Sequence, residues 1–146
     1  MSQRDDLMGG LEGEFGVLLH RLRRVVADRA RAVHPDLTGA SYLLLGHLLE
    51  HGPMRSSCLV ETFGVDKGAV SRQVRQLLDL GLVERRPDPE DGRAQLVAVS
   101  ESAREALVEV SGQRRKLLAD RLSDWTEDDL RGFVSVLGRY NAALAD

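Results

Sequence analysis

Three groups of residues in the sequence have types and spacings that could do chemistry. The first lies between Lys67 and Gln76, where three basic residues and no acidic residue occur. The second is the run from His47 to His51, which reads His-Leu-Leu-Glu-His and has the H-x-x-E-H spacing of a peptidase zinc site. The third is the single thiol, Cys58. Arginine and glutamine pair with base edges, histidine and glutamate bind metals, and a thiolate reacts with oxidants.

The basic group fits one face of a helix. At about 100° per residue, Val70, Val74 and Leu77 share one side, and with Leu78 they are predicted to form a buried stripe. The opposite side carries Gly68, Arg72, Arg75 and Gln76. Arginine pairs bidentately with guanine and glutamine with adenine, and a helix fits the major groove of B-DNA. The pattern therefore predicts a helix that reads base edges, and a solvated helix face is the alternative.

The histidines and the thiol favour ordinary structural roles. Two histidines four residues apart share a helix face, but Gly52-Pro53 is expected to end that helix and no third ligand is evident. We interpret His51 as a helix C-terminal cation or an exposed residue, and a metal-dependent hydrolase or a regulatory metal stays an alternative. Cys58 begins a predicted helix, where a thiol is activated, so oxidation sensing also stays open beside the favoured buried or inert thiol. No catalytic residue, cofactor or resident metal is predicted.

The apolar pattern predicts the helices that would position these residues. Thr38, Asp66 and Thr126 are of residue types typical of N-caps. Val65 and Val70 stand at hydrophobic-staple positions around Asp66. Helices are expected from Leu11 to the linker 33–36, from Gly39 to His51, from about Ser57 to Phe63, from Asp66 to Gly81, from Ser100 toward Asp124 and from Thr126 onward.

A hairpin follows the fourth helix. Leu82 to Arg86 and Arg93 to Val99 are short, Leu- and Val-rich segments, and the stretch 87–92 between them is dense in turn formers. Two short helices joined by Gly64-Val65-Asp66 and followed by such a hairpin predict a helix-turn-helix with a wing.

Composition limits the classes of protein. The 146 residues fit one domain, and 42% hydrophobic with 29% charged residues exclude a disordered chain. One cysteine excludes a disulfide framework and a Cys-based zinc knuckle. The polar start of the chain and the lack of a long apolar run predict a cytoplasmic protein. The net charge of −3 argues against nucleic acid, but 9 acidic against 7 basic residues between Glu101 and Asp146 place much of that acidity outside the basic helix.

From about Leu37 to Leu107 the sequence resembles the multiple-antibiotic-resistance regulator (MarR) family of winged helix-turn-helix transcription factors. The resemblance rests on LTGASYLLLGHLLEHGP, on the helix-turn-helix, on GLVERR and on the wing-tip pattern DPxDxR. It implies a mostly α, α+β fold in which Lys67, Ser71, Arg72 and Arg75 lie on the helix that enters the major groove. It also implies a wing pair in which Asp91 orients Arg93 toward a minor groove.

The same resemblance implies a domain organisation and partners. Residues 1–36 would form an N-terminal dimerisation helix, 37–99 the winged helix-turn-helix and 100–146 the C-terminal dimerisation helices. The expected function is a homodimeric repressor of transcription on a pseudo-palindromic double-stranded operator, with a small aromatic or phenolic effector. The alternative is an architectural or protein-interaction module without specific readout. The expected DNA-binding residues are Lys67, Gly68, Ser71, Arg72, Arg75, Gln76, Asp91 and Arg93.

Overall fold

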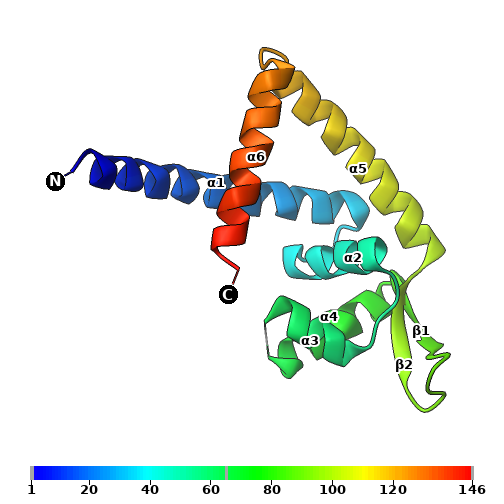
Figure 1. Cartoon of the computed structure of the whole chain (residues 1–146). Coiled ribbons are helices and arrows are strands. Elements are labelled where there is room, and N and C mark those ends of the chain that lie inside the picture. Colours follow the sequence, from blue (N-terminus) through cyan, green and yellow to red (C-terminus); the bar gives the residue numbers. More distant parts are fainter. Residues whose placement is uncertain (1, 65, 146) are drawn as a thin grey trace. The chain divides into compact units, whose positions relative to one another are not determined.

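The protein is mostly helical with one small antiparallel sheet, as the computed structural model of residues 2–64 and 66–145 shows (Figure 1). The predicted α+β, mostly α fold class is confirmed. The elements are α1 (Gln3–Val33), α2 (Gly39–His51), α3 (Ser56–Phe63), α4 (Lys67–Asp79), β1 (Val83–Pro87), β2 (Gln95–Val99), α5 (Glu101–Arg121) and α6 (Glu127–Ala143).

Contacts divide the chain into two compact units, and the boundary falls inside α5, between Val110 and Ser111. The assignment of residues 1–36 and 100–146 to dimerisation stays a prediction. Within the part of the chain that the structure describes, no helix has both the length and the apolar character needed to cross a membrane.

The three predicted N-caps are confirmed. Thr38 Oγ1 accepts a hydrogen bond from the Ser41 N–H at 3.2 Å, and Asp66 Oδ1 accepts one from the Ala69 N–H at 2.7 Å. Thr126 and Asp129 form a capping box, because each side chain accepts a hydrogen bond from the other residue's backbone N–H. Val65 of the predicted staple lies outside the described residues.

Two helix boundaries differ from the prediction. Helix α1 begins at Gln3, well before Leu11, because Ser2 and Asp5 form a capping box ahead of the apolar stripe. The Asp5 carboxylate accepts from the Ser2 N–H at 2.8 Å, and Ser2 Oγ accepts from the Asp5 N–H at 3.2 Å. Helix α5 ends at Arg121, short of Asp124, and a turn leads from it to α6.

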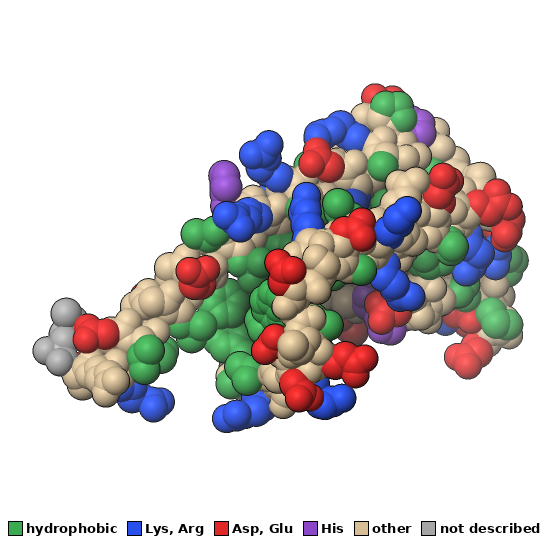
Figure 2. Space-filling view, turned by 90° about the horizontal axis from the view of Figure 1, so that it is seen from above, with side chains coloured by type: hydrophobic (Ala, Val, Ile, Leu, Met, Phe, Trp, Pro, Cys, Tyr) green, Lys and Arg blue, Asp and Glu red, His purple; other side chains and the backbone are tan. Residues whose placement is uncertain are grey.

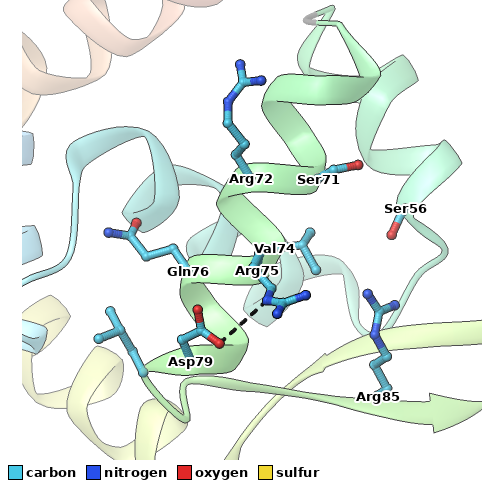
Figure 3. Close-up of a pocket in the computed structure, with 9 residues that line it drawn as sticks. Ser56, Ser71, Arg72, Val74, Arg75, Gln76, Asp79 and Arg85 are labelled. Atoms are coloured by element: carbon cyan, nitrogen blue, oxygen red, sulfur yellow. Dashed lines mark ion pairs between the residues drawn. The ribbon is translucent and has the colours of Figure 1, made fainter.

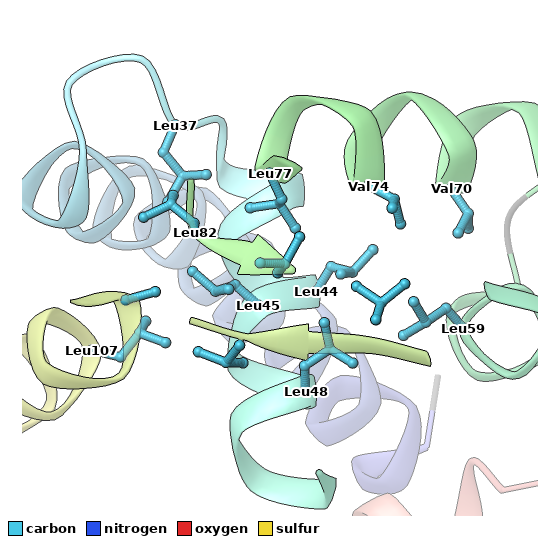
Figure 4. Packing of buried hydrophobic residues seen from close by; sticks show 14 of the residues in the cluster. Leu37, Leu44, Leu45, Leu48, Leu59, Val70, Val74, Leu77, Leu82 and Leu107 are labelled. Atoms are coloured by element: carbon cyan, nitrogen blue, oxygen red, sulfur yellow. The ribbon is translucent and has the colours of Figure 1, made fainter. Parts of the chain in front are cut away.

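The core of the first unit lies around α2 (Figure 4). The predicted stripe of α4 is buried at Val70, Val74 and Leu77, which are at most 2% exposed, whereas Leu78 is only partly buried. Burying one such side chain stabilises the fold by about 1.5–3 kcal/mol. The core therefore holds α4 and the sheet together. Its fully buried large side chains include Leu44, Leu45, Leu48, Leu59, Val70, Val74, Leu77 and Val97.

The sheet is a two-stranded hairpin whose base is attached to the linker before α3. Strands β1 and β2 are antiparallel, with Val83 opposite Val99 and Pro87 opposite Gln95. On the other side of β2, the Met54 N–H donates to the Val97 carbonyl at 3.2 Å and the Val97 N–H donates to the Met54 carbonyl at 2.9 Å. The backbone of the linker thus holds the hairpin in place.

Candidate nucleic-acid interface

Helix α4 has one buried face and one exposed cationic face. Lys67, Gly68, Ser71, Arg72 and Arg75 are all exposed, opposite the buried valines and Leu77. Helix α3 ends at Gly64, whose left-handed backbone conformation (φ 59°) closes the helix before Asp66 caps α4. This is the helix-turn-helix arrangement that the sequence predicts, with the second helix offering its polar side to a partner.

A groove of about 640 Å³ lies beside α4, between this helix and β1 (Figure 3). Arg72 and Arg75 reach it from α4, and Arg85 reaches it from β1. Arg75 forms an exposed ion pair with Asp79, whose nearest N···O distance is 3.7 Å. The hydroxyl groups of Ser56 and Ser71 also line the groove. Three arginines from two elements therefore line one cationic surface, which favours an anionic partner.

A second hollow of about 340 Å³ lies between α3 and α4 and shares Ser56 and Ser71 with the groove. Lys67 and Glu61 stand on its walls. Because the two hollows have these serines in common, the cationic surface continues past Arg72 toward the start of α4.

Sequence reasoning missed Arg85 and Ser56. The sequence did carry a signal for Arg85. Residues two apart in a strand share one face, so Arg85 lies on the same face of β1 as the buried Val83. Ser56 is the first residue of α3, one residue before the start that the sequence predicts, and its place beside α4 depends on tertiary packing.

Gly68 leaves room in the first turn of α4. A Cβ atom at this position would lie 3.0 Å from Asp66 Oδ1 and 3.3 Å from Arg72 Nη1. The missing side chain therefore accommodates both the capping carboxylate and the Arg72 guanidinium.

Gln76 has partners within the protein. Ser41 Oγ donates to Gln76 Oε1 at 2.7 Å, and Gln76 Nε2 donates to the Asp36 carbonyl at 3.0 Å. Figure 3 shows its side chain pointing away from Arg75 and Arg85. Gln76 thus lines the same groove as Arg72 and Arg75, but its amide is bonded to α2 and to the linker before α2.

The wing tip has a different bonding pattern from the expected one. Asp91 Oδ1 accepts a hydrogen bond from the backbone N–H of Arg93 at 3.0 Å, and among the described residues these two side chains form no ion pair. The turn also shifts the start of β2 to Gln95 from the predicted Arg93, since the Ala94 N–H donates to the Asp91 carbonyl at 3.0 Å. Asp91 therefore shapes the turn that carries Arg93.

An ion pair joins Arg55 to Asp88 at the start of the wing loop, and we call it the wing clamp. Arg55 Nη2 and Nε lie 2.7 and 2.8 Å from Asp88 Oδ2, and Asp88 Oδ1 accepts from the Glu90 N–H at 2.9 Å. The hydrogen bonds from Glu90 and Arg55 lower the pKa of Asp88, and Asp88 raises the pKa of Arg55. The clamp fixes the start of the wing loop to the residue that precedes α3.

The structure favours no metal site at the histidines. The rings of His47 and His51 stack with centroids 4.2 Å apart, and His47 packs edge-on against Phe63 at 5.3 Å. Over residues 2–64 and 66–145, no group of three or more His, Cys, Asp or Glu side chains could hold a metal ion. His51 is exposed in the last turn of α2, as interpreted from the sequence. Cys58 is exposed as well, which excludes a buried thiol, whereas an inert thiol and an oxidation sensor both stay predictions.

A helix-turn-helix with an exposed cationic second helix, flanked by a clamped hairpin on a shared core, defines a winged helix-turn-helix DNA-binding protein. Comparison with known proteins then gives the family. The MarR family model matches residues 36–94. An uncharacterized HTH-type transcriptional regulator of Bacillus subtilis (strain 168), YxaD, is 32% identical over 124 residues, which cover 85% of this chain and 87% of that protein. The chain therefore belongs to the MarR family of helix-turn-helix transcriptional regulators, which are DNA-binding proteins and not enzymes.

Solved structures show the same fold. The crystal structure of RV1404 from Mycobacterium tuberculosis matches with a TM-score of 0.77 at 24% identity, over 100% of this chain and 97% of that one. A MarR family transcriptional regulator from Listeria monocytogenes, crystallised with a 26mer DNA, matches with a TM-score of 0.71 at 16% identity, over 90% of this chain and 86% of that one.

Proposed function

We propose that this protein is a sequence-specific repressor that binds duplex operator DNA as a homodimer. The observation that carries the proposal is the convergence of Arg72, Arg75 and Arg85 on one exposed groove beside α4. Arg72 and Arg75, with Lys67, Gly68 and Ser71 around them, face the major groove. Arg85 on β1 and Ser56 on α3 lie outside α4. They contact the phosphate backbone and set the register of the protein on the duplex.

The wing supplies a second contact in this proposal. Arg93 is exposed at the wing tip, where the turn shaped by Asp91 presents it. A narrow minor groove has an enhanced negative potential that attracts arginine. Arg93 therefore reads the shape of the flanking minor groove, and the wing clamp keeps the hairpin at a fixed distance from α4.

Exposed apolar side chains on the terminal helices support the homodimer. On α1, Leu18 and Leu22 are 41% and 45% exposed, and on α6 Phe133 and Val134 are 51% and 68% exposed. Figure 2 shows hydrophobic side chains at the surface among charged ones. Exposed apolar side chains on each of these helices mark an interaction surface, and a two-fold partner would cover them. A dimer would also present two copies of α4 about 34 Å apart, one turn of DNA, as a pseudo-palindromic operator requires.

Repression and release are the finer parts of the proposal, and the family resemblance supports them. A dimer on promoter DNA excludes competing proteins from the same duplex. The protein acts in the cytoplasm, where that DNA lies. A small aromatic or phenolic effector would change the separation of the two α4 helices and so lower the affinity for the operator.

Selection from a randomised duplex library, followed by footprinting on the DNA that flanks the protein's own gene, tests the proposal. The parent protein should select a pseudo-palindrome. Arg72→Ala should lower affinity for it by about 1–3 kcal/mol and relax preference at one base pair, whereas Arg104→Ala on α5 should bind like the parent. Failure of the parent to select any sequence would favour the architectural or protein-interaction module. Equal losses on selected and random DNA would restrict Arg72 to a phosphate contact.

A further inference from the structure

We infer that Gln76 is a positioning residue, whose amide ties the recognition helix α4 to α2 and to the linker before α2. The inference rests on the proposed function, because it concerns how α4 meets DNA. It replaces the sequence prediction that Gln76 reads a base. Four residues form this connection, which we call the Gln76 junction: Asp36, Thr38, Ser41 and Gln76.

The amide of Gln76 is already engaged. Its Oε1 atom accepts from Ser41 Oγ at 2.7 Å and from Thr38 Oγ1 at 3.3 Å, so both acceptor positions of the oxygen are used. Its Nε2 atom donates to the Asp36 carbonyl at 3.0 Å. Reading adenine requires the same oxygen to accept and the same nitrogen to donate. Gln76 would have to leave the junction before it could contact a base in that way.

One residue of the junction, Ser41, anchors it in the core, whereas Asp36 and Thr38 are exposed. Ser41 is 0% exposed, and its hydroxyl donates to Gln76. A buried hydroxyl without a hydrogen-bond partner is unfavourable. The bond from Ser41 therefore opposes any movement of the Gln76 side chain toward solvent.

The junction joins α4 to the start of α2. Thr38 caps α2 by accepting from the Ser41 N–H and also donates to Gln76 on α4. The first turn of α2 packs closely on α1, since a Cβ atom on Gly39 would lie 3.2 Å from Val26 Cγ1. The hydrogen bonds of the junction therefore hold α4 to α2 and to the linker before α2.

This connection sets the direction in which the arginines point. Arg72 and Arg75 precede Gln76 on the same helix, on the side that faces the groove (Figure 3). A rotation of α4 about its axis displaces both guanidinium groups together, and bidentate pairing tolerates only about 10–20° of misalignment. Loss of the junction should therefore weaken preference at several base pairs at once.

Ser41 separates the positioning role from base reading, because a residue that is 0% exposed cannot touch DNA. The experiment compares full-length parent, Gln76→Met, Ser41→Ala and the double variant. For each protein, fluorescence anisotropy measures the affinity for the duplex that the parent selects and for a random duplex. Unfolding in urea measures the free energy of unfolding of each protein. Gln73→Met, on the same helix, is the matched control.

The ratio of selected-site to random affinity is the deciding quantity. A smaller folded fraction lowers both affinities and cancels in this ratio. We expect Gln76→Met and Ser41→Ala each to lower the ratio roughly tenfold, with preference flattened across the half-site, and the double variant to fall no further. The control should stay within about twofold of the parent. Should Gln76→Met fail to fold, Gln76→Glu keeps an acceptor for Ser41 and loses the donor to Asp36, and the same reduced ratio is expected.

Two outcomes overturn the inference. If Gln76→Met changes preference at a single base pair while Ser41→Ala leaves the ratio unchanged, Gln76 reads a base. If the double variant recovers both stability and the parent's ratio, the junction serves only the stability of the fold. A parent protein that selects no duplex would instead refute the proposed function, so the two failures are distinguishable.

Discussion

Replacing Gly68 with alanine tests how tightly the start of α4 is built. The added Cβ would lie 3.0 Å from Asp66 Oδ1, an atom that accepts from the Ala69 N–H at 2.7 Å. That hydrogen bond is already at the short end of the range, so Asp66 can move away only by weakening its cap. The other neighbour, Arg72 Nη1 at 3.3 Å, ends a flexible side chain and can move.

The two effects on stability oppose each other. Glycine to alanine inside a helix stabilises by about 0.5–1 kcal/mol. A lost N-cap bond costs about 0.5–2 kcal/mol, and a strained one costs part of that. We therefore expect Gly68→Ala to change the free energy of unfolding by less than about 0.5 kcal/mol, because gain and loss nearly cancel. Operator affinity should fall by about tenfold, since Arg72 is displaced.

Gly46→Ala is the matched control, because Gly46 lies within α2 and a Cβ there meets nothing within 4 Å. It should stabilise by about 0.5–1 kcal/mol and bind the operator like the parent. Urea unfolding and anisotropy titrations measure both quantities. The reasoning is refuted if Gly68→Ala stabilises as much as Gly46→Ala and binds DNA with the parent's affinity.

Three further substitutions test the clamp, the dimer and the wing tip. The lowered pKa of Asp88 means that its carboxylate stabilises the fold above its unfolded pKa, near 3.8, and that this stabilisation is lost as the pH falls through the lower folded value. Asp88→Asn should therefore destabilise the protein at neutral pH and flatten the acid decline of the unfolding free energy; a decline parallel to the parent's would contradict the clamp. Leu137 lies one turn after Phe133 on α6, on the same apolar face of that helix. Leu137→Asp therefore places a carboxylate in the proposed interface and should give a monomer in sedimentation that loses operator binding. A folded monomer that binds a full palindrome with the parent's affinity would exclude the dimer mechanism. Arg93→Ala should weaken binding mainly at sites with narrow A·T-rich flanks, and indifference to flank composition would count against a minor-groove role.

Local signals in the sequence predicted most of the fold. An N-cap connects residues three apart, so the caps at Thr38, Asp66 and Thr126 could be recognised without tertiary information. The buried stripe of α4 followed from the helical period for the same reason. The start of α1 had a local signal too, in Ser2 and Asp5, but the apolar stripe used to find the helix begins later.

The site was only partly predictable, because several of its determinants join distant parts of the chain. Helical period placed Arg72 and Arg75 on the exposed face, and the structure agrees. The same period placed Gln76 beside them, although its long side chain turns to Ser41, which is 35 residues away in the sequence. The clamp likewise joins residues 33 apart, Arg55 and Asp88. No local pattern distinguishes a polar residue that faces solvent from one that bonds across the core.

The wing is held along its strands and at the start of its loop, and it is exposed at its tip. Backbone pairing of Met54 with Val97 holds the middle of β2, and the bond from Arg55 to Asp88 holds the start of the loop, whereas residues 89–93 are exposed. Substitutions in that tip change the surface offered to DNA without altering the contacts that hold the strands. Under the proposed function, mutation of the tip can therefore change the flank preference while the half-site assigned to α4 stays the same, so the two parts of an operator can diverge at different rates among descendants.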